Sequence, residues 1–170
     1  MYIDKWWGNV TCGDTDDSMT LLDYFGERVE EKQENKYALS KIIEDAQLDK
    51  IFGKKPLYAE SDIECRFHYL GEDDEPYHED IDIPINLIID LSALLLQSLV
   101  EGKVALFEDD DGGDIEFSIS AEKKEIQMLI AELEKAVQEP HLYYPDFLQD
   151  EFAEMKDGII EISNELKAYC

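Results

Sequence analysis

The sequence predicts an α+β fold, in which a small and mostly antiparallel sheet packs against several helices around one buried central helix. Three observations carry this prediction. The chain has one long apolar block, from Ile83 to Val100. Apolar and polar residues alternate with a period of two in short segments near this block, and helical periodicity appears on both sides of it. Since 170 residues suffice for one sizeable core, we expect residues 1–170 to form a single domain.

Before the apolar block, one strand and two helices are expected. Residues 2–10 are rich in aromatic side chains, which is typical of a short strand. Asp17 or Ser18 can cap a first helix, whose apolar face includes Phe25. A second, shorter helix follows and is expected to stop near Gly53.

Two antiparallel hairpins are expected on either side of the central helix. Residues 63–70 and 79–85 both alternate between apolar and polar, so we expect them to pair. Residues 104–107 and 115–119 form the second expected hairpin, across a turn of glycines and acids. A right-handed crossover through the central helix would place both hairpins in one sheet, with their acidic connections at opposite ends.

The apolar block itself is the expected central helix, over residues 86–101. Its leucines repeat at helical spacing, Asn86 is the expected N-cap, and Gly102 is the expected C-terminal stop. Further apolar residues widen the stripe until little polar surface remains. We therefore expect this helix, with Leu94 near its middle, to be buried on most sides.

Two helices complete the predicted fold. Ser120 can cap the first of them, which should end before Pro140. Pro145 is well placed as the first residue of the last helix. Apolar residues repeat along that helix at regular spacing as far as Leu166, with Gly158 as a point of expected weakness.

The protein is strongly acidic. It has 42 Asp and Glu against 15 Lys and Arg, which gives a formal net charge of −27 at pH 7. Such a field repels nucleic acid and anionic lipid, and it favours a basic protein partner or cations. We therefore expect a protein partner with a basic surface, and neither nucleic acid nor membrane. The simpler alternative is that the charge only keeps the protein soluble.

Acidic residues concentrate in the connections of the two hairpins. The first connection, from Gly71 to His78, continues its charge onto the following strand, and we favour it as the firmer surface. The second contains Gly112 and Gly113, but neither glycine fits position six of an EF-hand loop, so only opportunistic cation binding stays open. The candidate partner-binding residues are Asp73, Asp74, Glu75, Glu79, Asp80, Asp82, Asp109, Asp110 and Asp111.

No catalytic, cofactor-binding or metal-binding pattern is recognisable. His78, Glu79, Asp80 and Asp82 form a loose metal-like group, but alternation along a strand sends Glu79 and Asp80 to opposite faces. The three cysteines match neither a zinc site nor a disulfide framework, and no serine elbow or phosphate-binding glycine loop is present. We therefore expect that the protein is not an enzyme and needs no cofactor or metal ion. A hydrolase with a pair of catalytic carboxylates is a further functional alternative.

The expected location is the cytoplasm. The chain does not open with a positively charged region followed by an apolar run, so we expect no signal peptide. The central apolar block is interrupted by Asn86, Asp90 and Gln97 and falls short of the roughly 20 apolar residues that a membrane span needs.

Part of the sequence resembles a known group of proteins. The motifs are Tyr2-Ile-Asp, Trp7-Gly8, Gly13, Thr15-Asp-Asp-Ser18, Asp23-Tyr24, Ile89-Asp-Leu-Ser-Ala-Leu-Leu-Leu96 and Gly102. They resemble bacterial immunity proteins of contact-dependent inhibition and related polymorphic toxin systems. The resemblance implies that the partner is the toxin domain of the same system; many such toxins are nucleases with basic clefts, which an acidic surface would meet faster. The alternative is an acidic adaptor or regulatory protein that binds another basic protein.

Overall fold

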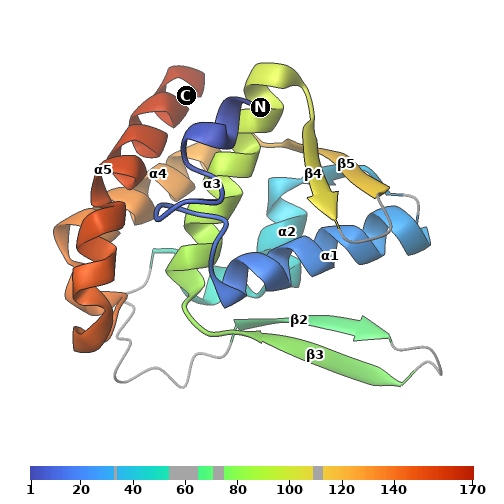
Figure 1. Ribbon diagram of the computed structural model, residues 1–170, viewed down its shortest axis with the longest axis horizontal. Coiled ribbons are helices and arrows are strands. Elements are labelled where there is room, and N and C mark those ends of the chain that lie inside the picture. The colour runs from blue at the N-terminus through green and yellow to red at the C-terminus, as the bar shows by residue number, and fades with distance from the viewer. Residues whose placement is uncertain (33, 54–64, 71–74, 109–112) are drawn as a thin grey trace.

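A computed structural model shows the central helix α3 (Pro84–Glu101) passing through the middle of the protein, with the other elements packed around it (Figure 1). The structure describes residues 1–32, 34–53, 65–70, 75–108 and 113–170. Every residue from Ile85 to Ser98 is buried. Gly102 ends the helix in the left-handed conformation, with φ at 81°, as glycine does most readily. The expected buried central helix is confirmed.

The N-terminal end of α3 differs from the prediction. The helix begins two residues earlier, at Pro84, whose fixed φ suits the first helical position. Asn86 is therefore not the N-cap. Instead, the carboxylate of Asp17 accepts hydrogen bonds from the backbone N–H groups of Asp82 (2.8 Å) and Ile83 (3.0 Å) and from the Asn86 side chain (3.3 Å). A residue 65 positions away from Asp82 thus holds the start of the helix.

Residues 2–10 do not form the expected strand. Tyr2–Lys5 is a short 3₁₀ helix, η1, and only isolated bridges follow it. The buried residues Ile3, within η1, and Trp6, directly after it, are three apart, which is a helical and not an alternating spacing. The backbone N–H of Ile3 donates to Gln97 Oε1 of α3 at 3.1 Å. Contact with α3 therefore decides the conformation of this aromatic segment.

Two expected helices follow in the first third of the chain. Helix α1 spans Asp16–Lys32. Helix α2 spans Leu39–Asp45 and so ends before Gly53, where the sequence predicted its end. A 3₁₀ turn, η2 (Leu48–Lys50), lies between the end of α2 and Gly53.

The strands form two sheets instead of one. Strands β2 (Cys65–Leu70) and β3 (Pro76–Ile81) make a separate antiparallel pair. Strands β4 (Val104–Glu108) and β5 (Gly113–Ser120) make the second expected hairpin. An unpredicted strand, β1 (Lys36–Ala38), pairs parallel with β5, so the second sheet has the order β1-β5-β4.

Strand β3 is displaced towards the N-terminus relative to the prediction of residues 79–85. Only Ile81, at 5% exposed, reaches the core from within the strand. The apolar residues that follow it belong to the entry into α3, because Pro84 already begins the helix. The predicted antiparallel pairing is confirmed for Cys65–Leu70, with Cys65 opposite Ile81, and residues 63 and 64 lie outside the described residues.

The C-terminal part consists of α4 (Lys123–Gln138) and α5 (Gln149–Leu166). Glu122, and not Ser120, is the N-cap of α4. Short 3₁₀ turns η3 (Pro140–Leu142) and η4 (Asp146–Leu148) connect the helices, so Pro145 precedes a turn and not α5 itself. A last turn, η5 (Lys167–Tyr169), follows α5.

Gly158 does not interrupt α5. A Cβ atom at this position would lie 2.3 Å from Thr11 Oγ1 and 2.5 Å from its methyl carbon. Both distances are far below van der Waals contact. Glycine is therefore required here because the N-terminal loop crosses directly over the helix.

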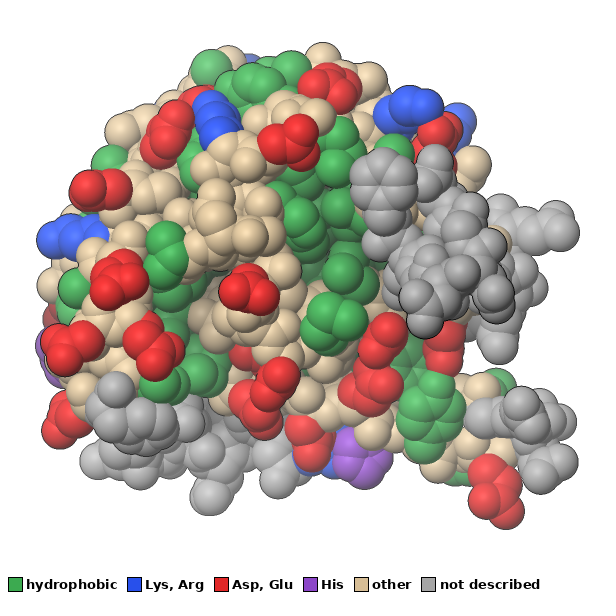
Figure 2. Space-filling model, viewed as in Figure 1, with side chains coloured by type: hydrophobic (Ala, Val, Ile, Leu, Met, Phe, Trp, Pro, Cys, Tyr) green, Lys and Arg blue, Asp and Glu red, His purple; other side chains and the backbone are tan. Residues whose placement is uncertain are grey.

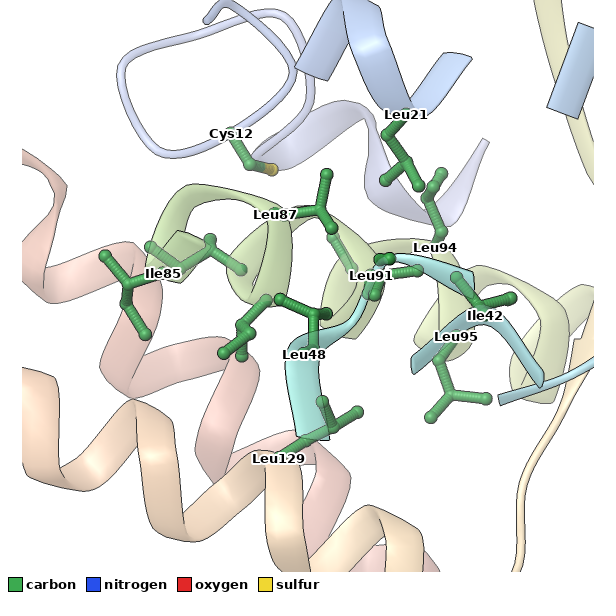
Figure 3. Packing of buried hydrophobic residues seen from close by; sticks show 14 of the residues in the cluster. Cys12, Leu21, Ile42, Leu48, Ile85, Leu87, Leu91, Leu94, Leu95 and Leu129 are labelled. Atoms are coloured by element: carbon green, nitrogen blue, oxygen red, sulfur yellow. The ribbon is translucent and has the colours of Figure 1, made fainter. Parts of the chain in front are cut away.

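The core is built around α3 (Figure 3). By length and composition this helix could cross a membrane, but 78% of the window is buried inside the protein. Burial against protein on most sides is what the central helix of a folded domain shows. Figure 3 shows its leucines among side chains from the N-terminal loop, α1, α2, η2 and α4: Leu87, Leu91, Leu94 and Leu95 against Cys12, Leu21, Ile42, Leu48 and Leu129.

Candidate interaction surface

The N-terminal motif with Gly13 and Ser18 is hydrogen-bonded to a buried carboxylate of the central helix. Asp90, in the middle of α3, is 1% exposed. Its two carboxylate oxygens accept hydrogen bonds from the Gly13 backbone N–H at 2.9 Å and from the Ser18 hydroxyl at 2.6 Å. Burial raises the pKa of Asp90 to about 7, although these two hydrogen bonds oppose the rise. The motif therefore joins the N-terminal loop to the central helix.

A second buried carboxyl continues this network. Burial raises the pKa of Asp17 to about 6, against the effect of its hydrogen bonds to Asp82, Ile83 and Asn86. Asn86 in turn accepts a hydrogen bond from the Tyr144 hydroxyl. These polar side chains are satisfied within the fold, which leaves them no role on the surface.

The two faces of the β2–β3 hairpin carry different chemistry. On the outer face, Asp80 Oδ1 lies 3.1 Å from Arg66 Nε and 3.7 Å from His78 Nε2. Positive and negative groups are therefore mixed there. Asp80 and Glu79 lie on opposite faces, as the alternation predicted, since Asp80 pairs with Arg66 and Glu79 with Phe67.

The inner face of the hairpin packs against α1. Phe67 is stacked on Tyr24 of α1, with ring centroids 4.4 Å apart. Farther along, Tyr69 and Tyr77 are stacked at 5.0 Å, and the Tyr77 hydroxyl donates to Glu27 of α1. Helix α1 and strand β3 thus run side by side in opposite directions, as Figure 1 shows.

Helix α1 presents an acidic stripe towards solvent beside this hairpin. Asp16, Asp23 and Glu27 lie within about 40° of one another around the helix, at 100° per residue. The antiparallel arrangement places Asp23 and Glu27 on the side of α1 that faces Glu79 of β3. Their negative charges raise the pKa of Glu79. Asp23 is exposed, whereas Glu27 and Glu79 are half-buried. We call Asp23, Glu27 and Glu79, with Tyr69 and Tyr77, the acidic cluster.

The charges of the acidic cluster are not balanced. Among the described residues, no lysine or arginine forms an ion pair with Asp23, Glu27 or Glu79. Burial raises the pKa of Glu79, and the charges of Asp23 and Glu27 raise it further. Burial likewise raises the pKa of Asp23. Figure 2 shows several red side chains in the lower part of the view, where α1 and the β2–β3 hairpin lie in Figure 1, together with green ones.

Two polar atoms in the acidic cluster are buried without a hydrogen bond. They are the Tyr69 hydroxyl and Glu79 Oε2. The hydroxyl lies near enough to Glu79 to favour its charged form, but the two groups do not reach hydrogen-bonding geometry. Tyr69 is only 9% exposed. Buried polar atoms of this kind are uncommon, so they mark the cluster as a place that lacks a partner.

The predicted partner-binding residues fall into four groups. Glu79 belongs to the acidic cluster, and Asp80 lies on the mixed outer face. Glu75 and Asp82 are exposed. The remaining five lie outside the described residues: Asp73, Asp74, Asp109, Asp110 and Asp111.

Sequence analysis missed Asp23 and Glu27. The signal was present in the spacing of four residues that places both on one side of α1, opposite the apolar stripe. That spacing predicts an acidic helix face, but it does not indicate that Glu79 lies beside it.

Other titratable groups have structural roles. Glu132, 4% exposed, accepts hydrogen bonds from the Gly53 backbone N–H at 3.0 Å and from the Tyr143 hydroxyl at 2.7 Å. Cys65 is fully buried, which raises the pKa of its thiol to about 11. Within the part of the chain that the structure describes, no three His, Cys, Asp or Glu side chains are grouped so that they could hold a metal ion.

Comparison with known proteins relates the chain to a protein family. A family model described as Immunity protein 68 matches residues 2–166. Neither the curated proteins nor the solved structures contain a match. The family match covers all five α-helices and both sheets.

Proposed function

Because the chain belongs to the immunity protein 68 family, we propose that it neutralises a cognate toxin by binding to it in a stoichiometric complex. The observation that carries this proposal is the extent of the family match, from residue 2 to residue 166. It includes every element that builds the core and the acidic cluster. The whole fold, and not an isolated motif, therefore supports the role.

The surface chemistry supports a basic toxin, such as a nuclease with a positively charged substrate cleft. The net charge of −27 attracts such a partner over long distances and raises the association rate. An acidic surface seated in the cleft also competes with the nucleic acid that the cleft would bind. Neutralisation in this form uses binding alone, without catalysis, and takes place in the cytoplasm of the toxin-producing cell.

Tight binding also requires apolar contacts, because charge contributes more to association rate and specificity than to affinity. Tyr77 is 39% exposed and Met19, on α1, is 55% exposed. Met19 lies one helical turn before Asp23. Apolar surface therefore adjoins the acidic cluster. Glu75 and Asp82 are exposed and stay candidates for the proposed acidic surface, and the other predicted acids lie outside the described residues.

The test uses the toxin domain encoded beside the gene for this chain. We expect co-expression of the two proteins to restore growth that the toxin domain alone abolishes. The purified proteins should form a complex of fixed stoichiometry in size-exclusion chromatography with light scattering. The association rate should fall steeply as salt is raised from about 50 to 500 mM, because salt screens the attraction. Failure to bind and to protect would refute the proposal.

A further inference from the structure

We infer that the acidic cluster between α1 and β3 is the docking site for an arginine side chain of the toxin. This inference rests on the proposed function, and it assigns the contact to Asp23, Glu27, Glu79 and Tyr69. Glu79 is among the candidates that the sequence suggests, whereas Asp23, Glu27 and Tyr69 lie outside the acidic connections that the sequence favours. The location follows from the tertiary structure, which places the acidic stripe of α1 beside β3.

The first argument is the uncompensated charge. Some other acids on this protein have cationic neighbours: Asp45, for instance, lies 2.7 Å from Arg28 and 2.5 Å from Lys41. Asp23, Glu27 and Glu79 have none among the described residues. Like charges held together destabilise the free protein, and a cation between them removes that repulsion.

The second argument is the pair of buried atoms that lack hydrogen bonds. Glu79 Oε2 needs a donor, and the Tyr69 hydroxyl can either accept or donate. A group that brings several N–H donors can satisfy the carboxylate and the phenol oxygen together. A cationic donor would also neutralise the charge of the carboxylates. The site therefore favours a cationic donor.

The third argument distinguishes arginine from lysine and from a metal ion. The guanidinium group is planar and carries five N–H donors, which suits several carboxylates around one point. It also stacks on aromatic rings, and the Tyr69–Tyr77 pair lies beside the carboxylates with Tyr77 partly exposed. A lysine ammonium is a compact, strongly hydrated charge without this planar complementarity. Described residues also form no metal-binding group.

The decisive comparison is between two triple variants with the same change in charge. The cluster variant carries Asp23→Asn, Glu27→Gln and Glu79→Gln. The control variant carries Glu151→Gln, Glu154→Gln and Asp157→Asn, all exposed positions of α5. Both variants lose three negative charges, of one Asp and two Glu. Long-range attraction therefore changes alike, and only the local contact differs.

We expect the cluster variant to raise the Kd for the neighbouring toxin domain by about 100-fold or more at 150 mM salt, mainly through faster dissociation. The control variant should raise it less than about fivefold, through slower association. Tyr69→Phe should weaken binding by about 3- to 10-fold. Melting temperatures of both triple variants are measured first. Removal of mutual repulsion should leave the cluster variant at least as stable as the wild type, so a loss of binding is not a loss of folding.

The arginine is identified from the toxin side. Each exposed arginine of the toxin domain is replaced by lysine, and the effect is measured against wild type and against Glu79→Gln. For one of these arginines, replacement by lysine should lower the affinity for the wild-type protein by about 10-fold or more but change the affinity for the Glu79→Gln variant little. This difference is the energetic coupling that a direct contact produces. If the cluster and control variants weaken binding equally, or if no arginine couples to Glu79, the inference is wrong while the proposed function stands. If wild type neither binds nor protects, both fall.

Discussion

Replacement of Asp90 by alanine and by asparagine tests whether the buried network holds the N-terminal loop to the central helix. Alanine removes both acceptors, so the Gly13 N–H loses its hydrogen bond and the Ser18 hydroxyl keeps only the Thr15 hydroxyl, 2.9 Å away, as an acceptor. Each unsatisfied buried donor costs about 1–3 kcal/mol. Loss of the buried charge offsets part of this, so we expect Asp90→Ala to lower the free energy of unfolding by about 2–4 kcal/mol at pH 7.

Asparagine keeps one acceptor oxygen for the Gly13 N–H, and the Ser18 hydroxyl can turn to accept from the new amide. Asp90→Asn should therefore cost less than about 1 kcal/mol at pH 7. The contrast between the two variants isolates the hydrogen bonds from the volume of the side chain.

The pH dependence supplies the second half of this test. The pKa of Asp90 is raised from 3.8 in the unfolded chain to about 7 in the folded protein. Between these values the folded state binds a proton that the unfolded state has released. The contribution of this group to stability is therefore complete below about pH 4 and is lost as the pH rises through about 7. Asp17, with a pKa of about 6, acts in the same direction.

The measurement is urea unfolding followed by tryptophan fluorescence, for wild type and Asp90→Asn, between about pH 5.5 and 7.5. Other titrating groups cancel in the difference between the two proteins. We expect wild type to gain on the order of 2 kcal/mol over Asp90→Asn as the pH falls across this range, at about 1.4 kcal/mol per unit of pKa shift. Parallel pH curves, or equal stability of the alanine and asparagine variants, would refute the reasoning.

Other substitutions test the core and the chemistry. Leu94→Asp should unfold the protein, because an unpaired charge at a fully buried position costs several kcal/mol, roughly the stability of a domain; a cooperative melting transition of this variant would contradict the central role of α3. Gly158→Ala should destabilise by about 1–3 kcal/mol through overlap with Thr11, and a double variant with Thr11→Ala should recover part of that loss in a mutant cycle. Asp17→Ala should cost about 2 kcal/mol in chemical denaturation, because two backbone N–H groups before α3 lose their acceptor. EDTA should leave the melting temperature unchanged, and restoration by calcium or zinc after a decrease would reveal a metal requirement.

The helices could be predicted from the sequence because their periodicity is a local property. The apolar stripe of α3, the alternation of β2 and the left-handed Gly102 each depend on residues within a few positions. The α+β class and the buried central helix are confirmed for this reason. The wrong predictions also have physical reasons. Residues 2–10 are rich in aromatic side chains, which favour a strand, but Tyr2–Lys5 forms a 3₁₀ helix whose Ile3 N–H donates to Gln97 of α3.

Strand β1, the start of α3 and the acidic cluster depend on contacts between residues far apart in the sequence. Strand β1 has three residues, too few for a periodic signal, and exists because β5 offers it a parallel partner. Nothing near Pro84 in sequence predicts that Asp17 would hold the start of α3. The candidate site follows the same pattern. The sequence indicates an acidic protein and an acidic face on α1, but only the packing of β3 against that helix brings Glu79 to Asp23 and Glu27, since proximity between distant segments depends on tertiary structure and not on local periodicity.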